Sequence, residues 1–137
     1  MASVEQAIRE ILVASAVNGM VAGKIRPLNA AQDEARPYVL FAMSAVEPID
    51  TFDGPCEWEK TSVEVTSYAD TYKAVLSLCQ ACRAALHHYA GTAGGLDIAP
   101  CLMTEETSVE TVSEPGMESP VYVRTQTYRL LNRPTQE

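Results

Sequence analysis

The sequence predicts an α+β fold: a single domain over residues 1–137, with a mainly antiparallel sheet of four or five strands and two helices packed on it. Apolar residues make up 47% and charged residues 20% of the chain, which is typical of a packed core. The periodic patterns follow the order helix, strands, helix, strands. A length of 137 residues fits one domain. We expect a short frayed tail after about residue 132.

The opening helix is predicted from apolar positions that share one helical face. These positions are Val4, Ala7, Ile8, Ile11 and Leu12. Ser3 and Gln6 form a capping-box pattern in front of it, and Gly19 is the expected stop. Charged residues interrupt the apolar stretch and no basic leader precedes it, so we expect a helix rather than a signal peptide.

Two strands are predicted after this helix. Residues 23–28 form a short extended piece, and residues 29–36 a polar loop. Residues 38–46 are apolar on both faces, which is typical of a strand covered on both sides or placed in mid-sheet. A loop over 48–55 is expected from its Pro, Asp and Gly residues. Alternation over residues 57–68 predicts a half-buried antiparallel strand.

A second helix is predicted over residues 71–89, with Asp70 as N-cap and Gly91 as C-terminal stop. Its polar side chains occupy a single arc of the helical wheel. They are Lys73, Ser77, Gln80, Arg83, His87 and His88. The remaining apolar side is wider than a helix on one sheet needs. A second surface therefore covers this helix, and either the first helix or a neighbouring subunit fits that role.

The last third of the chain contains two further predicted strands. Residues 92–95 form a flexible turn, and 98–104 form a strand that Pro100 makes an edge or irregular one. Residues 105–119 are polar and acidic, so a solvated hairpin or loop is the ordinary interpretation. The final strand covers residues 121–131.

The charge balance argues against tight binding to DNA. Eighteen acids and ten bases give a net charge of −8, whereas proteins that neutralise phosphates are usually basic. Residues 89–123 contain no Lys, Arg or His but several acids. This stretch is either a solvated surface or one that avoids DNA or docks on a basic partner. No apolar run approaches the roughly 20 residues that cross a bilayer, so we expect no membrane partner.

The cysteines are interpreted as free, mostly buried thiols in a reducing compartment. They are Cys56, Cys79, Cys82 and Cys101. A zinc site made of Cys79, Cys82, His87 and His88 is opposed by geometry, because one straight helix cannot bring all four to one ion. A redox Cys-x-x-Cys normally stands at a helix N-terminus, and this pair is in mid-helix. We therefore expect no metal site.

Signatures of catalysis are missing from the sequence. There is no glycine-rich phosphate loop and no Gly-x-Ser-x-Gly elbow. His87 and His88 are adjacent, so their side chains diverge, and no nearby acid orients either one. We predict that the protein is not an enzyme, with no catalytic, cofactor-binding or metal-binding residues and no cofactor.

Several segments, in order and spacing, resemble the tail-completion proteins of bacteriophages, also called tail terminators and first described as a domain of unknown function. The resemblance covers nearly the whole chain. Its carriers are the opening helix, Gly23 to Pro27, Arg36 to Val39, Gly54-Pro55, Val63 to Val65, Tyr68 to Tyr72, and Arg83 to Leu86.

The resemblance implies a structural virion protein: a homohexameric ring that caps the tail tube of a long-tailed phage and joins it to the head connector. Its partners would be further copies of itself, the tail tube protein and the head-tail connector proteins, with DNA passing through the channel without specific binding. It would be located in the tail or neck of the virion and assembled in the host cytoplasm. Head-to-tail contacts close into a ring when each subunit offers two different patches, and the Pro100 strand or the last strand is a candidate edge for one of them.

Two alternatives stay open. The first is a neighbouring head-tail connector, either a stopper or an adaptor. The second is a small cytoplasmic enzyme or ligand-binding module with a pocket that uses His87, His88 or Cys56.

Overall fold

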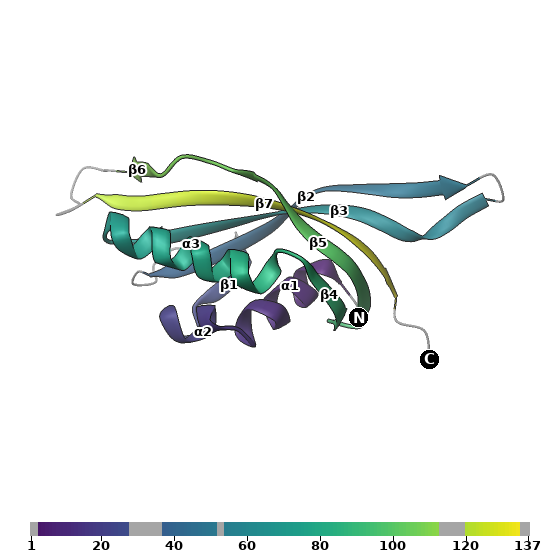
Figure 1. Cartoon of the computed structure of the whole chain (residues 1–137), viewed down its shortest axis with the longest axis horizontal. Coiled ribbons are helices and arrows are strands. Elements are labelled where there is room, and N and C mark those ends of the chain that lie inside the picture. Colours follow the sequence, from purple (N-terminus) through teal and green to yellow (C-terminus); the bar gives the residue numbers. More distant parts are fainter. Residues whose placement is uncertain (1–2, 28–36, 52–53, 113–119, 135–137) are drawn as a thin grey trace.

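A computed structural model describes residues 3–27, 37–51, 54–112 and 120–134. It consists of helices and one extended sheet (Figure 1). The elements in chain order are α1 (Val4–Val13), α2 (Ala16–Met20), β1 (Ile25–Pro27), β2 (Tyr38–Thr51), β3 (Gly54–Ala69), α3 (Tyr72–Leu86), β4 (Tyr89–Ala93), β5 (Leu96–Glu106), β6 (Glu110–Val112) and β7 (Val121–Pro134). The α+β class is confirmed.

The strands form one mixed sheet of seven strands rather than the four or five predicted. The order is β1-β2-β3-β7-β5-β4, and β6 also pairs with β7. β1 runs parallel to β2, and every other pair is antiparallel. All three helices lie on one face of the sheet, and the opposite face is open (Figure 1).

The extra strands come from segments with weak local signals. β4 occupies residues assigned to the end of the second helix and to a flexible turn, and it pairs with β5. β6 lies inside the acidic stretch and pairs with the start of β7. Cross-strand hydrogen bonds define both strands, and side-chain periodicity over three to five residues is too short to reveal them.

The long hairpin of β2 and β3 replaces most of the predicted loop over 48–55. Register pairing continues to Thr51 opposite Gly54, so both strands are longer than predicted. From Tyr38 to Pro48 and from Glu59 to Ala69 the hairpin belongs to the body of the sheet. The predicted polar loop at 29–36, residues 113–119 of the acidic stretch and the last three residues lie outside the described residues.

The first helical segment is divided in two at Ser15. The Ser3 hydroxyl accepts a hydrogen bond from the Gln6 amide at 3.1 Å, which confirms the predicted cap. Ser15 Oγ then donates to the Leu12 carbonyl at 2.7 Å and accepts from the Val17 amide at 3.2 Å. This serine ends one helix and caps the next, so the predicted single helix up to Gly19 is wrong.

α3 is shorter than predicted at both ends. Its N-cap is Thr71, whose hydroxyl accepts from the Ala74 amide at 3.0 Å, rather than Asp70. The helix ends before Gly91, because His87 is already extended and His88 has a φ of +68°. A left-handed residue stops a helix as a glycine does, and here a histidine occupies that position.

The two remaining strands also differ from the prediction. Pro100 lies in a register shift of β5 between Ala99 and Leu102, which confirms the predicted irregular strand. β7 and β4 flank this part of β5, so it is not an edge strand. β7 continues to Pro134, past the predicted start of a frayed tail, since Arg133 pairs with Asp97 at 3.2 Å.

The core lies between the helices and the covered face of the sheet. The predicted apolar face of α1 is buried in full. Tyr128 and Leu130 of β7 are buried in the same cluster, as are Leu78 and Leu86 of α3. α3 also contacts α1 and α2, so the first helical segment covers part of its wide apolar side. Tyr72, at its start, remains 55% exposed.

Candidate assembly surfaces

The cysteines that the structure describes are inert core residues. Cys79, Cys82 and Cys101 are free and buried. Burial raises the pKa of Cys82 and of Cys101 to about 12. No group of three or more His, Cys, Asp or Glu residues in the described part of the chain could hold a metal ion. The side chain of Cys56 lies outside the described residues.

The side chains of His87 and His88 do not diverge as expected, since their ring centroids are 4.0 Å apart, and both residues bond to the backbone of β5. His87 Nδ1 accepts a hydrogen bond from the Met103 amide at 3.0 Å, and the His88 amide donates to the Cys101 carbonyl at 2.6 Å. Partial desolvation lowers the pKa of His87, and His88 and Arg83 lower it further. A ring nitrogen that accepts a hydrogen bond carries no proton, so the bond from Met103 requires a neutral His87 ring. Together the two hydrogen bonds hold the α3–β4 junction against β5 and stabilise it.

A buried polar cluster, which the sequence analysis missed, links α3 to β7 and β5. The Gln126 amide donates to the Cys79 carbonyl at 3.0 Å and to Glu106 at 2.6 Å. Tyr128 donates to the Gln126 side-chain carbonyl at 2.9 Å, and Arg124 pairs with Glu106 at 3.0 Å. The sequence feature that could have revealed this cluster is Gln126, which lies on the same face of β7 as Tyr128. That face is the buried one. Its hydrogen bonds are internal, as expected of a structural cluster.

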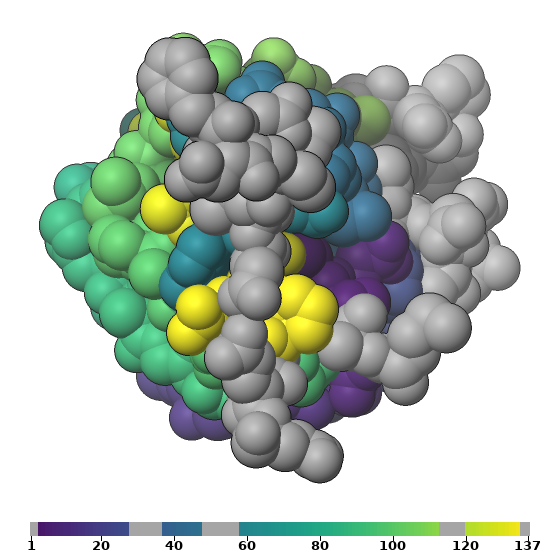
Figure 2. Space-filling view, turned by 90° about the vertical axis from the view of Figure 1, so that its right-hand side faces the viewer, coloured from purple at the N-terminus to yellow at the C-terminus, as the bar shows by residue number. Residues whose placement is uncertain are grey.

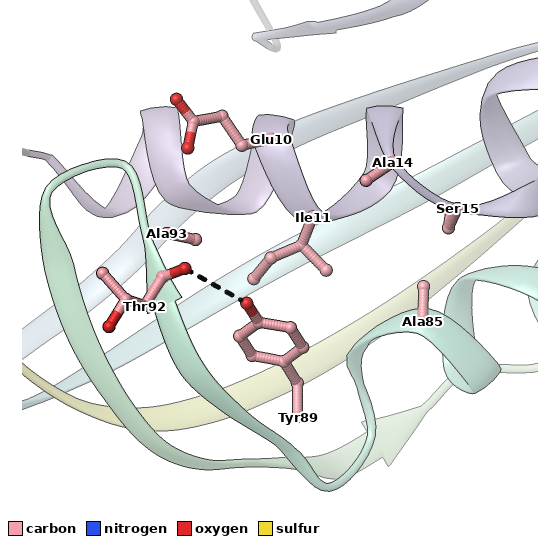
Figure 3. A pocket seen from close by; sticks show the side chains of 8 residues that line it. All are labelled: Glu10, Ile11, Ala14, Ser15, Ala85, Tyr89, Thr92 and Ala93. Atoms are coloured by element: carbon pink, nitrogen blue, oxygen red, sulfur yellow. Dashed lines mark hydrogen bonds between the residues drawn. The ribbon is translucent and has the colours of Figure 1, made fainter.

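A first groove, of about 420 Å³, lies between α1, the end of α3 and β4 (Figure 3). Its apolar lining includes Ile11, Ala85 and Ala93, and the Tyr89 hydroxyl points toward the Thr92 carbonyl, to which it donates at 3.5 Å. Glu10 is the single carboxylate among its eight lining residues. The Glu10 carboxylate accepts a hydrogen bond from the Gly94 amide, and a single carboxylate does not make an acid–base pair.

A second concave surface lies at the base of the β2–β3 hairpin. Beyond Pro48 and Glu59 the two strands pair only with each other among the described residues, and this arm projects from the body (Figure 1). A groove of about 310 Å³ at its base contains Met43 and Val46, which are 42% and 48% exposed. Figure 2 looks onto this end of the molecule, where the last residues of β7 reach the surface near α1.

A third groove, of about 290 Å³, lies on the open face of the sheet. Its apolar lining includes Pro100, Leu102 and Leu131, and its charged lining is Lys60 and Arg129. Leu102 is 40% exposed. The groove therefore combines an exposed apolar slot with two cations.

Within the part of the chain that the structure describes, strand edges without a partner occur at both sides of the sheet. β1 covers the outer side of β2 only from Val39 to Phe41, and β4 covers β5 only as far as Cys101. β7, which the sequence analysis considered as an edge, lies in the middle of the sheet between β3 and β5. That expectation is wrong: among the described residues the edges belong to β1, β4 and β6, and to the parts of β2 and β5 that β1 and β4 leave uncovered.

Comparisons with known proteins give a family match and a similar solved structure. A family model described as "Tail completion protein gp17" matches residues 6–114. A solved structure described as the virion of a native gene transfer agent particle has a chain that is similar with a TM-score of 0.73 and 11% identity, over 96% of this chain and 95% of that one. A search of curated proteins finds no match. In the described residues, no helix is long and apolar enough to cross a membrane.

Proposed function

Since the chain belongs to the tail completion protein family, which confirms the resemblance seen in the sequence, we propose that it is a ring-forming tail terminator. The family match over residues 6–114 carries this proposal, and it makes the chain a structural tail protein of a phage or phage-like particle. The ring, the cap on the tail tube and the joint to the head connector are the finer parts of the proposal.

The hairpin arm supports an assembly role. A two-stranded ribbon is only marginally stable by itself in water, and the arm extends beyond the sheet and the helices (Figure 1). The exposed Met43 and Val46 at its base add apolar area that a partner would bury. An arm of this kind is suited to reach a neighbouring subunit or the rim of the tube.

The charge also fits a channel for DNA. A net charge of −8 disfavours attraction to phosphates, so the ring passes DNA without holding it. In this proposal the protein works by shape and surface contacts, with no catalytic step, no cofactor and no membrane partner, and it resides in the tail or neck of the virion.

The test is assembly on purified tail tubes. We expect closed rings, hexameric by the proposal, in mass photometry of the protein with tubes, and density at one tube end in electron microscopy. The protein should also stop further tube growth. A chain that stays monomeric and leaves tubes uncapped would contradict the proposal. Binding to portal-complex proteins without binding to tubes would favour the connector role instead.

A further inference from the structure

We propose that the groove lined by Lys60, Leu102 and Arg129 binds the β6 end of a neighbouring copy of this chain, through Glu110 and Val112. This inference rests on the proposed ring assembly and names one of its contacts. It starts from unpaired charges of opposite sign at two places on the open face of the sheet.

The groove lies on the open face by strand register. Val63 and Tyr128 are register partners buried beneath the helices. Successive side chains of a strand point to opposite faces, so the adjacent pair Ser62 and Arg129 points away from the helices. Lys60 and Leu131, two residues further along, share this orientation.

Neither cation of the groove is in an ion pair among the described residues, although Glu47 is the register partner of Lys60 across the β2–β3 hairpin. The ion pairs formed there join Arg124 to Glu106 and Arg133 to Asp97. Lys60 and Arg129 are in neither pair, and they flank an apolar slot that is open at Leu102. Such a slot matches a short segment with an apolar side chain beside a carboxylate.

The β6 end supplies that pair of side chains. Glu110 pairs in register with Val123, and Val112 with Val121, so both side chains lie on the open-face side of β6. Val112 is 39% exposed, and Glu110 has no ion-pair partner among the described residues. Residues 89–123 contain no Lys, Arg or His, and Arg124, the next residue on β7, is already paired with Glu106.

The two surfaces are far apart on one copy. Val123 and Leu131, their neighbours on β7, are eight residues apart, which corresponds to about 26 Å along a strand. The contact therefore cannot form within a chain. Between these places the sheet coils, with β5 and β7 curling away from the hairpin arm (Figure 1), so each copy offers its groove and its β6 end to different neighbours. Such a heterologous contact is the type that closes into rings.

Charge reversal tests this contact. We expect Lys60→Glu with Arg129→Glu to weaken self-association at least about tenfold, because like charges then face each other. The matched control is Arg9→Glu with Lys73→Glu, two exposed helix positions with the same change in net charge. Combining the groove variant with Glu110→Lys should restore most of the association. Thermal unfolding of each variant verifies that it is folded.

The outcomes separate this inference from the proposed function. A groove variant that assembles as well as the helix control overturns this contact and leaves the ring intact. Loss of assembly that Glu110→Lys does not restore overturns the β6 partner named here. A wild-type chain that stays monomeric with and without tail tubes overturns both proposals.

Discussion

The imidazole Nδ1 of His87 accepts a hydrogen bond of 3.0 Å from the backbone amide of Met103. β4 pairs with β5 only as far as Cys101. Beyond that point the His87 ring, instead of a backbone carbonyl of a paired strand, accepts the hydrogen bond from β5. One side chain thereby closes part of an edge that would otherwise be exposed to other strands.

This hydrogen bond predicts a pH dependence of stability. The pKa of His87 is lowered in the folded state from its ordinary value of 6.5, so the unfolded chain binds the proton more readily. The stabilising contribution is complete above about pH 6.5 and is lost as the pH falls through the lower, folded pKa. Thermal unfolding should show a steeper loss toward pH 5 in the wild type than in His87→Asn, which keeps an acceptor that does not titrate. Equal slopes would contradict the role of His87.

Gly94 is predicted to be intolerant of a side chain. Its φ is +59°, and a Cβ there would lie 2.5 Å from the Ala7 backbone nitrogen. Its amide also donates to Glu10 at 2.6 Å, which joins α1 to the β4–β5 turn. We expect Gly94→Ala to lower the free energy of unfolding by about 2 kcal/mol or more, measured by denaturant titration.

Gly19 provides the matched control for that substitution. It lies within α2, and nothing is within 4 Å of an added Cβ. Gly19→Ala should raise stability by about 0.5–1 kcal/mol, because alanine favours the helix. Similar effects of the two substitutions would show that the close approach at Gly94 does not matter.

The buried Gln126 should show coupling with Tyr128. Gln126→Leu leaves the Tyr128 hydroxyl without its acceptor in the core, and an unsatisfied buried group costs about 1–3 kcal/mol. Adding Tyr128→Phe removes the orphaned hydroxyl, so the double variant should be more stable than Gln126→Leu alone. A double-mutant cycle by denaturant unfolding measures this coupling, and strict additivity would refute it.

The thiols should be protected until the protein unfolds. Burial raises the pKa of Cys82 and Cys101 to about 12, and only thiolates react readily. In a Cys56→Ser variant, a thiol reagent at about pH 8 should label the folded chain very slowly and all three remaining cysteines after unfolding. Stability should also fall as the pH rises above the ordinary thiol value of 9.0, because only the unfolded thiols then ionise. Rapid labelling of the folded variant would contradict this packing.

Shortening the arm should separate folding from assembly. Replacing residues 48–59 by Asn-Gly joins the register partners Glu47 and Lys60 through a two-residue hairpin turn. The replacement removes the Glu59 carbonyl, which accepts a hydrogen bond from Asn132, and the Trp58 ring, which contacts Arg133, so thermal stability should fall slightly while the chain stays folded. Capping of tail tubes, scored by electron microscopy, should be lost. Unimpaired capping would exclude the arm from the contact.

Some tertiary features lay beyond any local reading of the sequence. β4 and β6 are short strands, each paired with the next strand along the chain, so pairing defines them and periodicity does not. Gln126 becomes a core residue because β7 runs between β3 and β5 beneath α3. The end of α3 at His87 depends on the hydrogen bonds of His87 and His88 to β5.

The sequence by itself determined the α+β class, the buried face and cap of α1, the body of β2 and β3, and the resemblance to the tail completion family, because these follow from periodicity and capping within short windows. Only the tertiary structure decided that the last strand is central, that the hairpin extends as an arm, and that Lys60 and Arg129 flank an open-face groove. These features depend on which strands pair and in which register, and long-range pairing is set by the packing of the whole chain.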